Sequence, residues 1–203
     1  MLILNKPTST YLQCKKWAES KKPNPLFLEI LPKLYNIAIE NGIDPTLVVA
    51  QCAKETGYCK FGGVLDASFR NPCGLKIVKG GGDYDPNAHK RFDSWDDGIT
   101  AQCQHLALYA GKEGYPLSNP LDPRHFSYLL GKCKTVESLS GNWAGKTYGQ
   151  DLVVMMAQII NTDVDELYEF ESMIEELKSI IEEKDKTIKD LQDKLYRIKE
   201  ILE

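Results

Sequence analysis

The fold is decided by residues 44–59, DPTLVVAQCAKETGYC. Asp44 is a favourable N-cap and Pro45 suits the first turn of a helix, so the pattern predicts a helix that runs to about Tyr58. Steps of three and four residues place five side chains on one stripe of this helix: Leu47, Val48, Cys52, Glu55 and Cys59. A glutamate therefore stands in the middle of an apolar face.

Glu55 has no basic residue at the matching spacing, because Lys54 and Lys60 point elsewhere on the helix. Loss of hydration raises the pKa of a carboxyl group, and so does the negative end of a helix, which Glu55 approaches near Gly57. A glutamic acid that stays protonated near neutral pH has the property that a general acid needs to protonate a glycosidic oxygen. The spacing equally allows Glu55 to end the helix exposed or salt-bridged.

Helical patterns flank this stretch on both sides. Residues Pro25 to Asn41 carry apolar side chains at helical spacing and are followed by Gly42. Farther along, Asp96 or Asp97 is predicted to cap another helix. Its apolar stripe is Ile99, Cys103, Leu106 and Ala110. The last helix of the body, about Tyr148 to Ile160, is apolar nearly all round and is predicted to be the central, buried one.

A β-hairpin is predicted among these helices. Residues 75–79 and 89–94 bracket Gly80-Gly81-Gly82-Asp83, a composition typical of a hairpin or of an open loop in its place. The fold class expected for the body, residues 1–162, is therefore mainly α with a small β-hairpin.

The tail, residues 163–203, has the pattern of a coiled-coil helix. Apolar residues step by three and four from Leu167 to Leu202, with isoleucine at the middle a positions and only Lys184 breaking the seam. This distribution favours a parallel two-stranded coil, so a homodimer through residues 167–202 is expected, with a trimer or tetramer as the main alternative. The other interpretation is an amphipathic helix docked on its own body.

Charge and composition exclude several classes of protein. The chain has 203 residues, 42% apolar, and a net charge of −4. From Asp163 onward there are 14 acidic and 7 basic residues, net −7, which leaves 15 acidic and 18 basic residues, net +3, in the body. A body at +3 is too weakly charged to predict nucleic-acid binding. No apolar stretch of about 18 residues is present, so membrane insertion is not expected.

No metal or cofactor is predicted. The six cysteines form no C-x-x-C pair and are expected to be mostly buried thiols in a reducing compartment. Asp83-x-Asp85-x-Asn87 begins like a calcium loop, but Ala88 stands where that loop requires glycine. The three histidines have no spacing that builds a ligand set or a nucleophile–base pair.

Three segments follow one another in an order that a known family shares. Residues 49–57 are VAQCAKETG, residues 71–76 are NPCGLK, and Trp143-Ala144 with Tyr148-Gly149 closes the body. They resemble the “AQxAxESG”, “NxFGIK” and “WATDPxY” signatures of the bacterial glucosaminidases that cut peptidoglycan, glycoside hydrolase family 73 in the lysozyme-like superfamily. The resemblance covers roughly residues 26–161. It departs from the family at Cys73, where an aromatic residue is usual, and at residues 145–147.

The resemblance implies a lysozyme-like α+β lobe, with a cleft for peptidoglycan glycan strands beside the hairpin. It makes Glu55 the general acid. Tyr148 would support the oxocarbenium-like centre or orient the substrate's N-acetyl group, unless it only packs at the start of its helix. The expected substrate-binding residues are Asn71, Gly74, Asp85 and Trp143. Trp143, like Trp95, is equally a candidate for the core.

The second catalytic group is expected in the hairpin. Asp83 and Asp85 are the candidates, with Asp93 on the return segment, and Asp83 is preferred because it closes the glycine run. A carboxylate about 5–5.5 Å from the acid suggests retention and one about 6.5–9.5 Å away suggests inversion, while the substrate's N-acetyl group can replace it. The sequence leaves all three mechanisms open.

The function expected from the resemblance is an endo-β-N-acetylglucosaminidase that cleaves the β-1,4 glycan backbone. A lytic transglycosylase or muramidase would use the same Glu55, and a non-catalytic wall-binding or structural module would use only the coil. No export signal is recognised at the N-terminus. Together with the compact single catalytic domain and the coiled-coil tail, this favours a phage or prophage lysin over a housekeeping autolysin. Such a lysin is made in the cytosol and is released by a holin or carried on a particle to the bacterial cell wall.

Overall fold

The computed structural model describes residues 1–164 and 166–202, which form six α-helices and four short 3-10 helices. The α-helices are α1 (Tyr11–Ser20), α2 (Pro25–Glu40), α3 (Pro45–Thr56), α4 (Trp95–Ala110), α5 (Tyr148–Ile160) and α6 (Glu166–Leu202). The 3-10 helices are η1 (Ala67–Phe69), η2 (Pro86–Ala88), η3 (Ser127–Leu129) and η4 (Glu137–Leu139). The mainly α class is confirmed.

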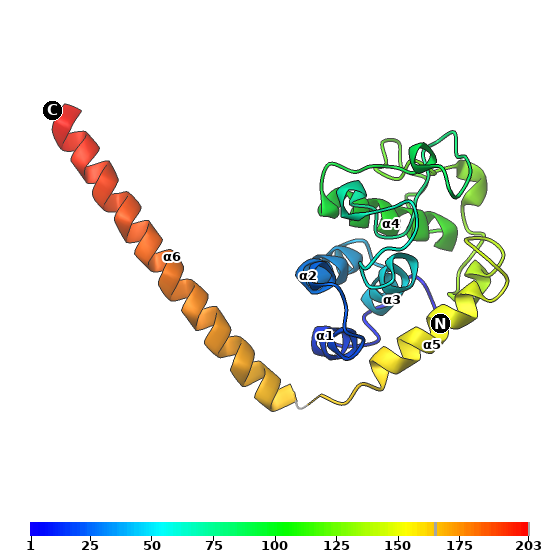
Figure 1. The fold of residues 1–203 in the computed structure, drawn as a ribbon, viewed down its shortest axis with the longest axis horizontal. Helices are drawn as coiled ribbons and strands as arrows, with labels where there is room; N and C mark the ends of the chain where they lie inside the picture. Colours follow the sequence, from blue (N-terminus) through cyan, green and yellow to red (C-terminus); the bar gives the residue numbers. More distant parts are fainter. Residues whose placement is uncertain (165, 203) are drawn as a thin grey trace. The chain divides into compact units, whose positions relative to one another are not determined.

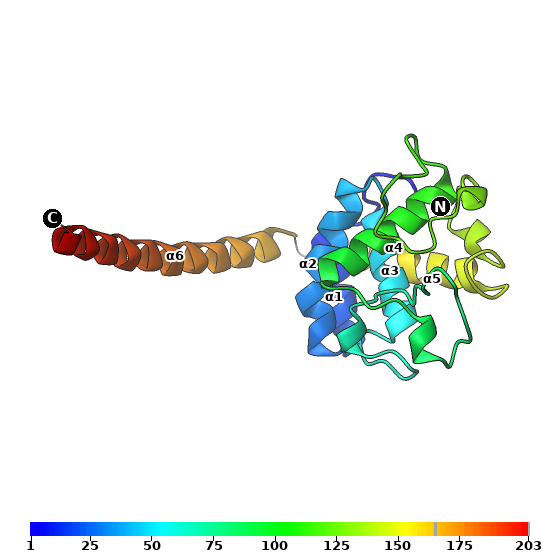
Figure 2. The same ribbon diagram turned by 90° about the horizontal axis from the view of Figure 1, so that it is seen from above.

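The chain divides into two compact units, Met1–Asp163 and Val164–Glu203, which are described separately. In the first unit α3 packs against α2 and α5, and α1 packs against α2 and α5. α4 packs against α2 and lies across α3, as the two perpendicular views show (Figures 1 and 2).

The central helix of the body is α3. Every residue from Pro45 to Ala53 is buried. The prediction that the last body helix holds this place is wrong, because α5 buries only one face, which includes Leu152, Met156 and Ile159, while Val154 is 57% exposed on the other.

Local sequence signals explain most of the helix boundaries. Asp44 accepts a hydrogen bond from the Thr46 N–H at 3.0 Å and caps α3, as predicted. The cap predicted for α4 is wrong by a few residues: Ser94 caps it, and its hydroxyl accepts from the Asp97 N–H at 3.0 Å. Asp96 and Asp97 instead lie in the first turn, where the positive end of the helix stabilises their negative charges.

The described residues contain isolated β-bridges but no β-strand, so the predicted hairpin is reduced to a loop closed by one antiparallel bridge, Lys76 to His89. The Ile77 N–H donates to the Ala88 carbonyl at 2.9 Å, and the Lys90 N–H donates to the Leu75 carbonyl at 2.9 Å. Pairing stops there because η2 occupies Pro86–Ala88. The open loop that the sequence also allowed is the arrangement present.

The second unit contains α6, a helix of 37 residues. Along it several large apolar side chains are about half exposed: Ile174, Leu177, Ile180, Ile181, Ile188, Leu191 and Leu195. Among the described residues, no helix has an apolar stretch long enough to cross a bilayer.

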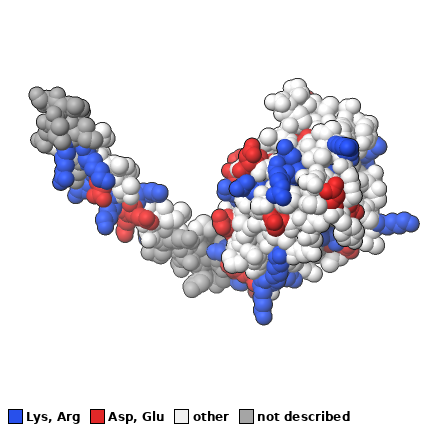
Figure 3. Space-filling model, turned by 45° about the horizontal axis from the view of Figure 1, so that its top comes forward, with Lys and Arg blue, Asp and Glu red and all other residues white. Residues whose placement is uncertain are grey.

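Basic and acidic side chains are interspersed on the face of the body drawn in Figure 3. Among the body's surface charges, Lys33 pairs with Asp96 at 2.7 Å and Lys54 pairs with Asp151 at 2.9 Å. That face therefore presents a mixed charge rather than one basic stripe.

Candidate active site

A cleft of about 610 Å³ opens in the body and contains Glu55 in its wall. Loops supply most of the lining, while α3 and α4 contribute Glu55, His105 and Tyr109. The remaining residues are Phe61, Gly62, Gly63, Val64, Leu65, Cys73, Gly74, Leu75, Lys76, Asp83, His89, Arg124, Asn142, Trp143 and Ala144. Segments far apart in sequence therefore meet around one carboxyl group.

The end of α3 sets the position of Glu55. Gly57 follows as the C-cap with φ 56°, and the left-handed turn continues through Tyr58 and Cys59, whose φ angles are also positive. Glu55 thus lies in the last turn of α3, where unpaired carbonyl groups disfavour a negative charge. Its side chain is open to the cleft and forms no ion pair among the described residues.

A chain of hydrogen bonds connects Glu55 to the interior. Tyr148 donates its hydroxyl proton to Oε1 of Glu55, and the same hydroxyl accepts from Nε2 of Gln51 at 3.0 Å. Oε1 of Gln51 in turn accepts from Nε2 of Gln102 at 2.8 Å. Tyr148 and both glutamines are buried. The carboxyl group is therefore held in one orientation by buried groups from α3, α4 and α5.

Electrostatics at Glu55 are dominated by desolvation, which raises the pKa of its carboxyl group. Hydrogen bonds from Tyr148 and Trp143 and the charge of Lys54 act in the opposite direction, but the pKa remains raised. The effect of Lys54 is limited because it pairs with Asp151. Glu55 is thus accessible from the cleft, while the protein atoms around its carboxyl group displace water and favour the protonated form.

Tyr148 permits a pH test of this arrangement. Because its hydrogen bond lowers the Glu55 pKa, Tyr148→Phe raises that pKa further. If Glu55 serves as a general acid, which works while protonated, the alkaline limb of the pH–activity profile should move to higher pH. Tyr84→Phe, a 92% exposed tyrosine, is the control and should leave the profile in place. A limb that stays fixed or moves to lower pH in Tyr148→Phe contradicts the assignment.

The predicted hairpin carboxylates separate into two environments. Asp83 lines the cleft with Glu55 and pairs with Lys76 at 2.5 Å, and this hydrogen bond and charge lower the pKa of Asp83. Asp85 instead caps η2 by accepting from the Asn87 N–H at 2.9 Å. Neither Asp85 nor Asp93 lines the cleft. Only Asp83 is brought together with Glu55.

Asn71 holds one wall of the cleft from behind. Its Nδ2 donates to the carbonyls of Leu75 at 2.8 Å and Lys90 at 3.0 Å, and its Oδ1 accepts from the Leu75 N–H at 3.0 Å. The Asn71 side chain is buried, and these bonds hold the segments that carry Leu75 and Lys90 together. Gly74, with φ 70°, lies in the lining itself.

Trp143 lies in the cleft wall and contacts two other rings there. Its ring centroid is 5.0 Å from that of His105 and 6.1 Å from that of Tyr109. Trp95 is partly buried against the core and does not line the cleft. Of the two tryptophans, Trp143 alone is placed where a sugar ring can reach it.

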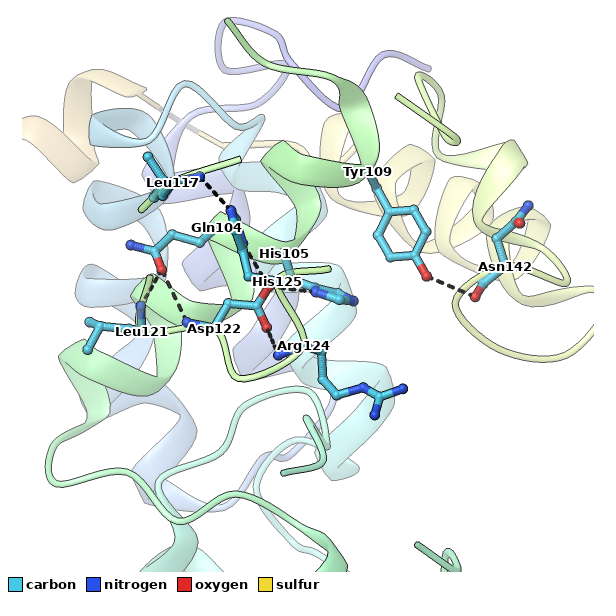
Figure 4. Close-up of polar contacts among 9 residues, drawn as sticks. All are labelled: Gln104, His105, Tyr109, Leu117, Leu121, Asp122, Arg124, His125 and Asn142. Atoms are coloured by element: carbon cyan, nitrogen blue, oxygen red, sulfur yellow. Dashed lines mark hydrogen bonds and ion pairs between the residues drawn. The ribbon is translucent and has the colours of Figure 1, made fainter. Parts of the chain in front are cut away.

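The structure adds a buried polar cluster that sequence spacing did not predict (Figure 4). Oδ2 of Asp122 lies 2.7 Å from Nδ1 of His105 and 3.1 Å from Nδ1 of His125, within hydrogen-bond distance of both. Its Oδ1 accepts a hydrogen bond from the Arg124 N–H at 2.8 Å. His105 also faces the cleft. Because 17 residues separate His105 on α4 from Asp122 in a loop, no local motif connects them.

All six cysteines are buried and free. Burial raises the pKa of Cys14 to about 12, and it raises the pKa of Cys73 in the cleft wall as well. These two thiols are therefore poor candidates for a nucleophile. Within the part of the chain that the structure describes, no three His, Cys, Asp or Glu side chains are grouped to hold a metal ion.

Comparison of the chain with protein-family models, with curated proteins and with solved structures finds no match. The functional argument therefore depends on the residues of the cleft.

Proposed function

We propose that the body is a peptidoglycan hydrolase of lysozyme-like architecture in which Glu55 is the general acid. The observation that carries the proposal is a glutamic acid with a raised pKa, open to a cleft and oriented by the buried chain through Tyr148. Such a group can deliver a proton to the oxygen of a glycosidic bond as the bond breaks. The proposed bond is the β-1,4 linkage of the glycan backbone, on the reducing side of N-acetylglucosamine, by resemblance to the family 73 glucosaminidases.

The cleft has the features that a glycan site needs. Trp143 offers an aromatic face for a sugar ring, and Asn142 and Lys76 bring polar groups to the cleft lining. Arg124 and His89 add further nitrogen groups that suit the carboxylates of peptidoglycan stem peptides. Gly74 keeps the wall low where a strand would pass. We assign substrate contact to these residues and a supporting role to Asn71.

Product analysis tests the proposal against its alternatives. Purified peptidoglycan is incubated with the protein, and the released fragments are reduced and identified by mass spectrometry. Reduced N-acetylglucosamine ends support a glucosaminidase, whereas reduced N-acetylmuramic ends indicate a muramidase and anhydro ends a lytic transglycosylase. Intact strands that nevertheless retain the protein indicate a non-catalytic wall-binding module.

We further propose that α6 joins two chains in a parallel coiled coil. Half-exposed apolar side chains recur along it at heptad spacing, which is the pattern of a seam. Two bodies on one coil would raise the effective concentration at the wall through linkage. This arrangement suits a lysin that acts on the bacterial wall from a particle or after release by a holin.

The oligomer proposal predicts a concentration-independent dimer in light scattering at micromolar chain concentration. The double variant Ile181→Lys, Ile188→Lys places charge at two a positions, which are 58% and 52% exposed in the single chain, and should be monomeric. Glu182→Lys, at an outward b position, is the matched control and should stay dimeric. A monomeric full-length chain, or a double variant that still dimerises, overturns the proposal.

A further inference from the structure

His105 and Asp122 form a dyad, and His105 lies in the cleft lining with its side chain 8% exposed. The Nδ1–H of His105 donates to Oδ2 of Asp122 at 2.7 Å, and Asp122 is fully buried. The bond therefore fixes the tautomer and leaves a lone pair on Nε2 of His105. No described residue hydrogen bonds to this Nε2, although His105 is in the cleft lining.

The second histidine of the cluster shows that the carboxylate is built to hold imidazole rings. The Leu117 N–H donates to Nε2 of His125 at 3.0 Å, so the proton of that ring lies on Nδ1 and is donated to Asp122. The Arg124 N–H supplies a third donor to Asp122. Three donors compensate for the lost hydration of the buried carboxylate. His125 is outside the cleft lining, so His105 is the member of the pair that can meet a substrate.

His105 is also placed near the general acid without touching it. Trp143 links the two: its ring centroid is 5.0 Å from that of His105, and it lines the cleft with Glu55, whose pKa it helps to lower. The two groups come from different helices, α4 and α3. Both groups line the same cleft, so a sugar and a water molecule bound there can meet both, as an inverting hydrolase requires of its acid and base.

We propose that His105, oriented by Asp122, is the general base of the glycan hydrolysis whose general acid is Glu55. The inference rests on the proposed function and names its second catalytic group. A water oxygen forms a bond to the anomeric carbon while its proton moves to Nε2 of His105. The glycosidic C–O bond breaks, its electron pair goes to the leaving oxygen, and that oxygen takes the proton of Glu55. The anomeric configuration is inverted.

Asp83 is the weaker candidate for the same role. Its side chain is 84% exposed and paired with Lys76 at 2.5 Å, and the pairing lowers its pKa. A carboxylate whose pKa is lowered is a poorer proton acceptor. His105 has instead an acceptor nitrogen with no hydrogen-bond partner among the described residues and a buried partner that fixes its orientation.

The test uses the full chain and soluble glycan strands, with the first product followed by proton NMR. We expect the α-anomer to appear first from the β-linked strand. His105→Asn keeps a side-chain donor for Asp122 and removes Nε2, so kcat should fall at least about 100-fold while KM changes little. Asp122→Asn should also lower kcat, because the tautomer of His105 is no longer fixed. His125→Asn, which alters a ring on the same carboxylate outside the cleft, should lose only a few-fold.

Rescue by azide distinguishes a histidine that acts as general base from one that is only structural. Azide is an anionic nucleophile that needs no deprotonation, so it should restore turnover to His105→Ala and to Asp122→Asn and yield an α-glycosyl azide, but it should not restore Glu55→Gln. A β-anomer as first product, His105→Asn with more than half of the wild-type kcat, or absence of rescue by azide overturns the proposal. Cleavage by the wild type that depends on Glu55 establishes the hydrolase separately, so either idea can fail alone.

Discussion

Glu55→Gln should reduce the rate of peptidoglycan cleavage by about 100- to 10,000-fold, the range that general acid–base catalysis supplies. The amide keeps the size of the side chain, and its oxygen can still accept the hydrogen bond of Tyr148. It has no proton of suitable acidity for the leaving oxygen. The measurement is the initial rate of appearance of reducing ends from purified walls.

The same substitution should not destabilise the body. The folded-state pKa of Glu55 is raised, so the stability that the group contributes is present at low pH and is lost as pH rises through that pKa. Above this pKa the desolvated charge of Glu55 lowers the free energy of unfolding, and a neutral amide at this position does not. We expect the thermal midpoint of Glu55→Gln near pH 8 to equal or exceed that of the wild type.

Glu40→Gln is the matched control, because Glu40 is exposed at the end of α2 and does not line the cleft. It should retain the wild-type rate. A folded Glu55→Gln variant with more than half of the wild-type rate would show that Glu55 is not the general acid.

The helices of the body were largely predictable because their signals are local. Asp44 caps α3 as predicted, and Asn24 caps α2 in the same way, although the sequence analysis did not identify it; each is followed by proline. α1 has an equally local signal, since Thr10 and Gln13 form a capping box, and that pattern would have revealed it. Ser94, three residues before Asp97, is a further capping pattern and explains why the predicted start of α4 was late.

Burial was harder to predict than helicity. Composition alone made α5 appear the most buried helix, yet Val154 is exposed and Asp151 pairs with Lys54 at its surface. The position of a helix depends on which neighbours cover it, and that is a tertiary property. The prediction of a glycine-rich hairpin was wrong for a related reason. Asp85 caps η2, and this short helix competes with strand pairing.

Part of the candidate site was visible in the sequence and part was not. Helical spacing placed Glu55 on a stripe with Leu47, Val48 and Cys52; in the structure those three are buried, whereas Glu55 is exposed to the cleft. Desolvation raises its pKa, as the sequence analysis expected. The polar chain from Gln102 through Gln51 to Tyr148 joins three helices, so no local pattern contains it. The contact of His105 with Asp122 likewise depends on a loop path that only the folded chain defines.

Gly98→Ala is expected to have the largest effect on stability. A Cβ at this position of α4 would lie 2.0 Å from the Arg70 carbonyl oxygen and 3.1 Å from Cδ of Pro72. Alanine gains about 1 kcal/mol in helix propensity over glycine, but a clash with backbone cannot be relieved by a rotamer change. Overpacking typically costs about 1–3 kcal/mol and occasionally more. We expect a net loss of about 3 kcal/mol, which lowers the thermal midpoint of a domain of this size by about 6–12 °C.

The effect should extend to the cleft, because the segment that Gly98 touches carries Asn71. Displacement of residues 70–72 weakens the bonds of Asn71 to Leu75 and Lys90, which hold the cleft wall. Activity measured well below the thermal midpoint should therefore fall together with stability. Gly82→Ala is the control, since a Cβ there meets no atom within 4 Å, and its thermal midpoint should stay close to that of the wild type. Equal thermal midpoints for the two variants would contradict the close approach of Gly98 on α4 to the Arg70 carbonyl group.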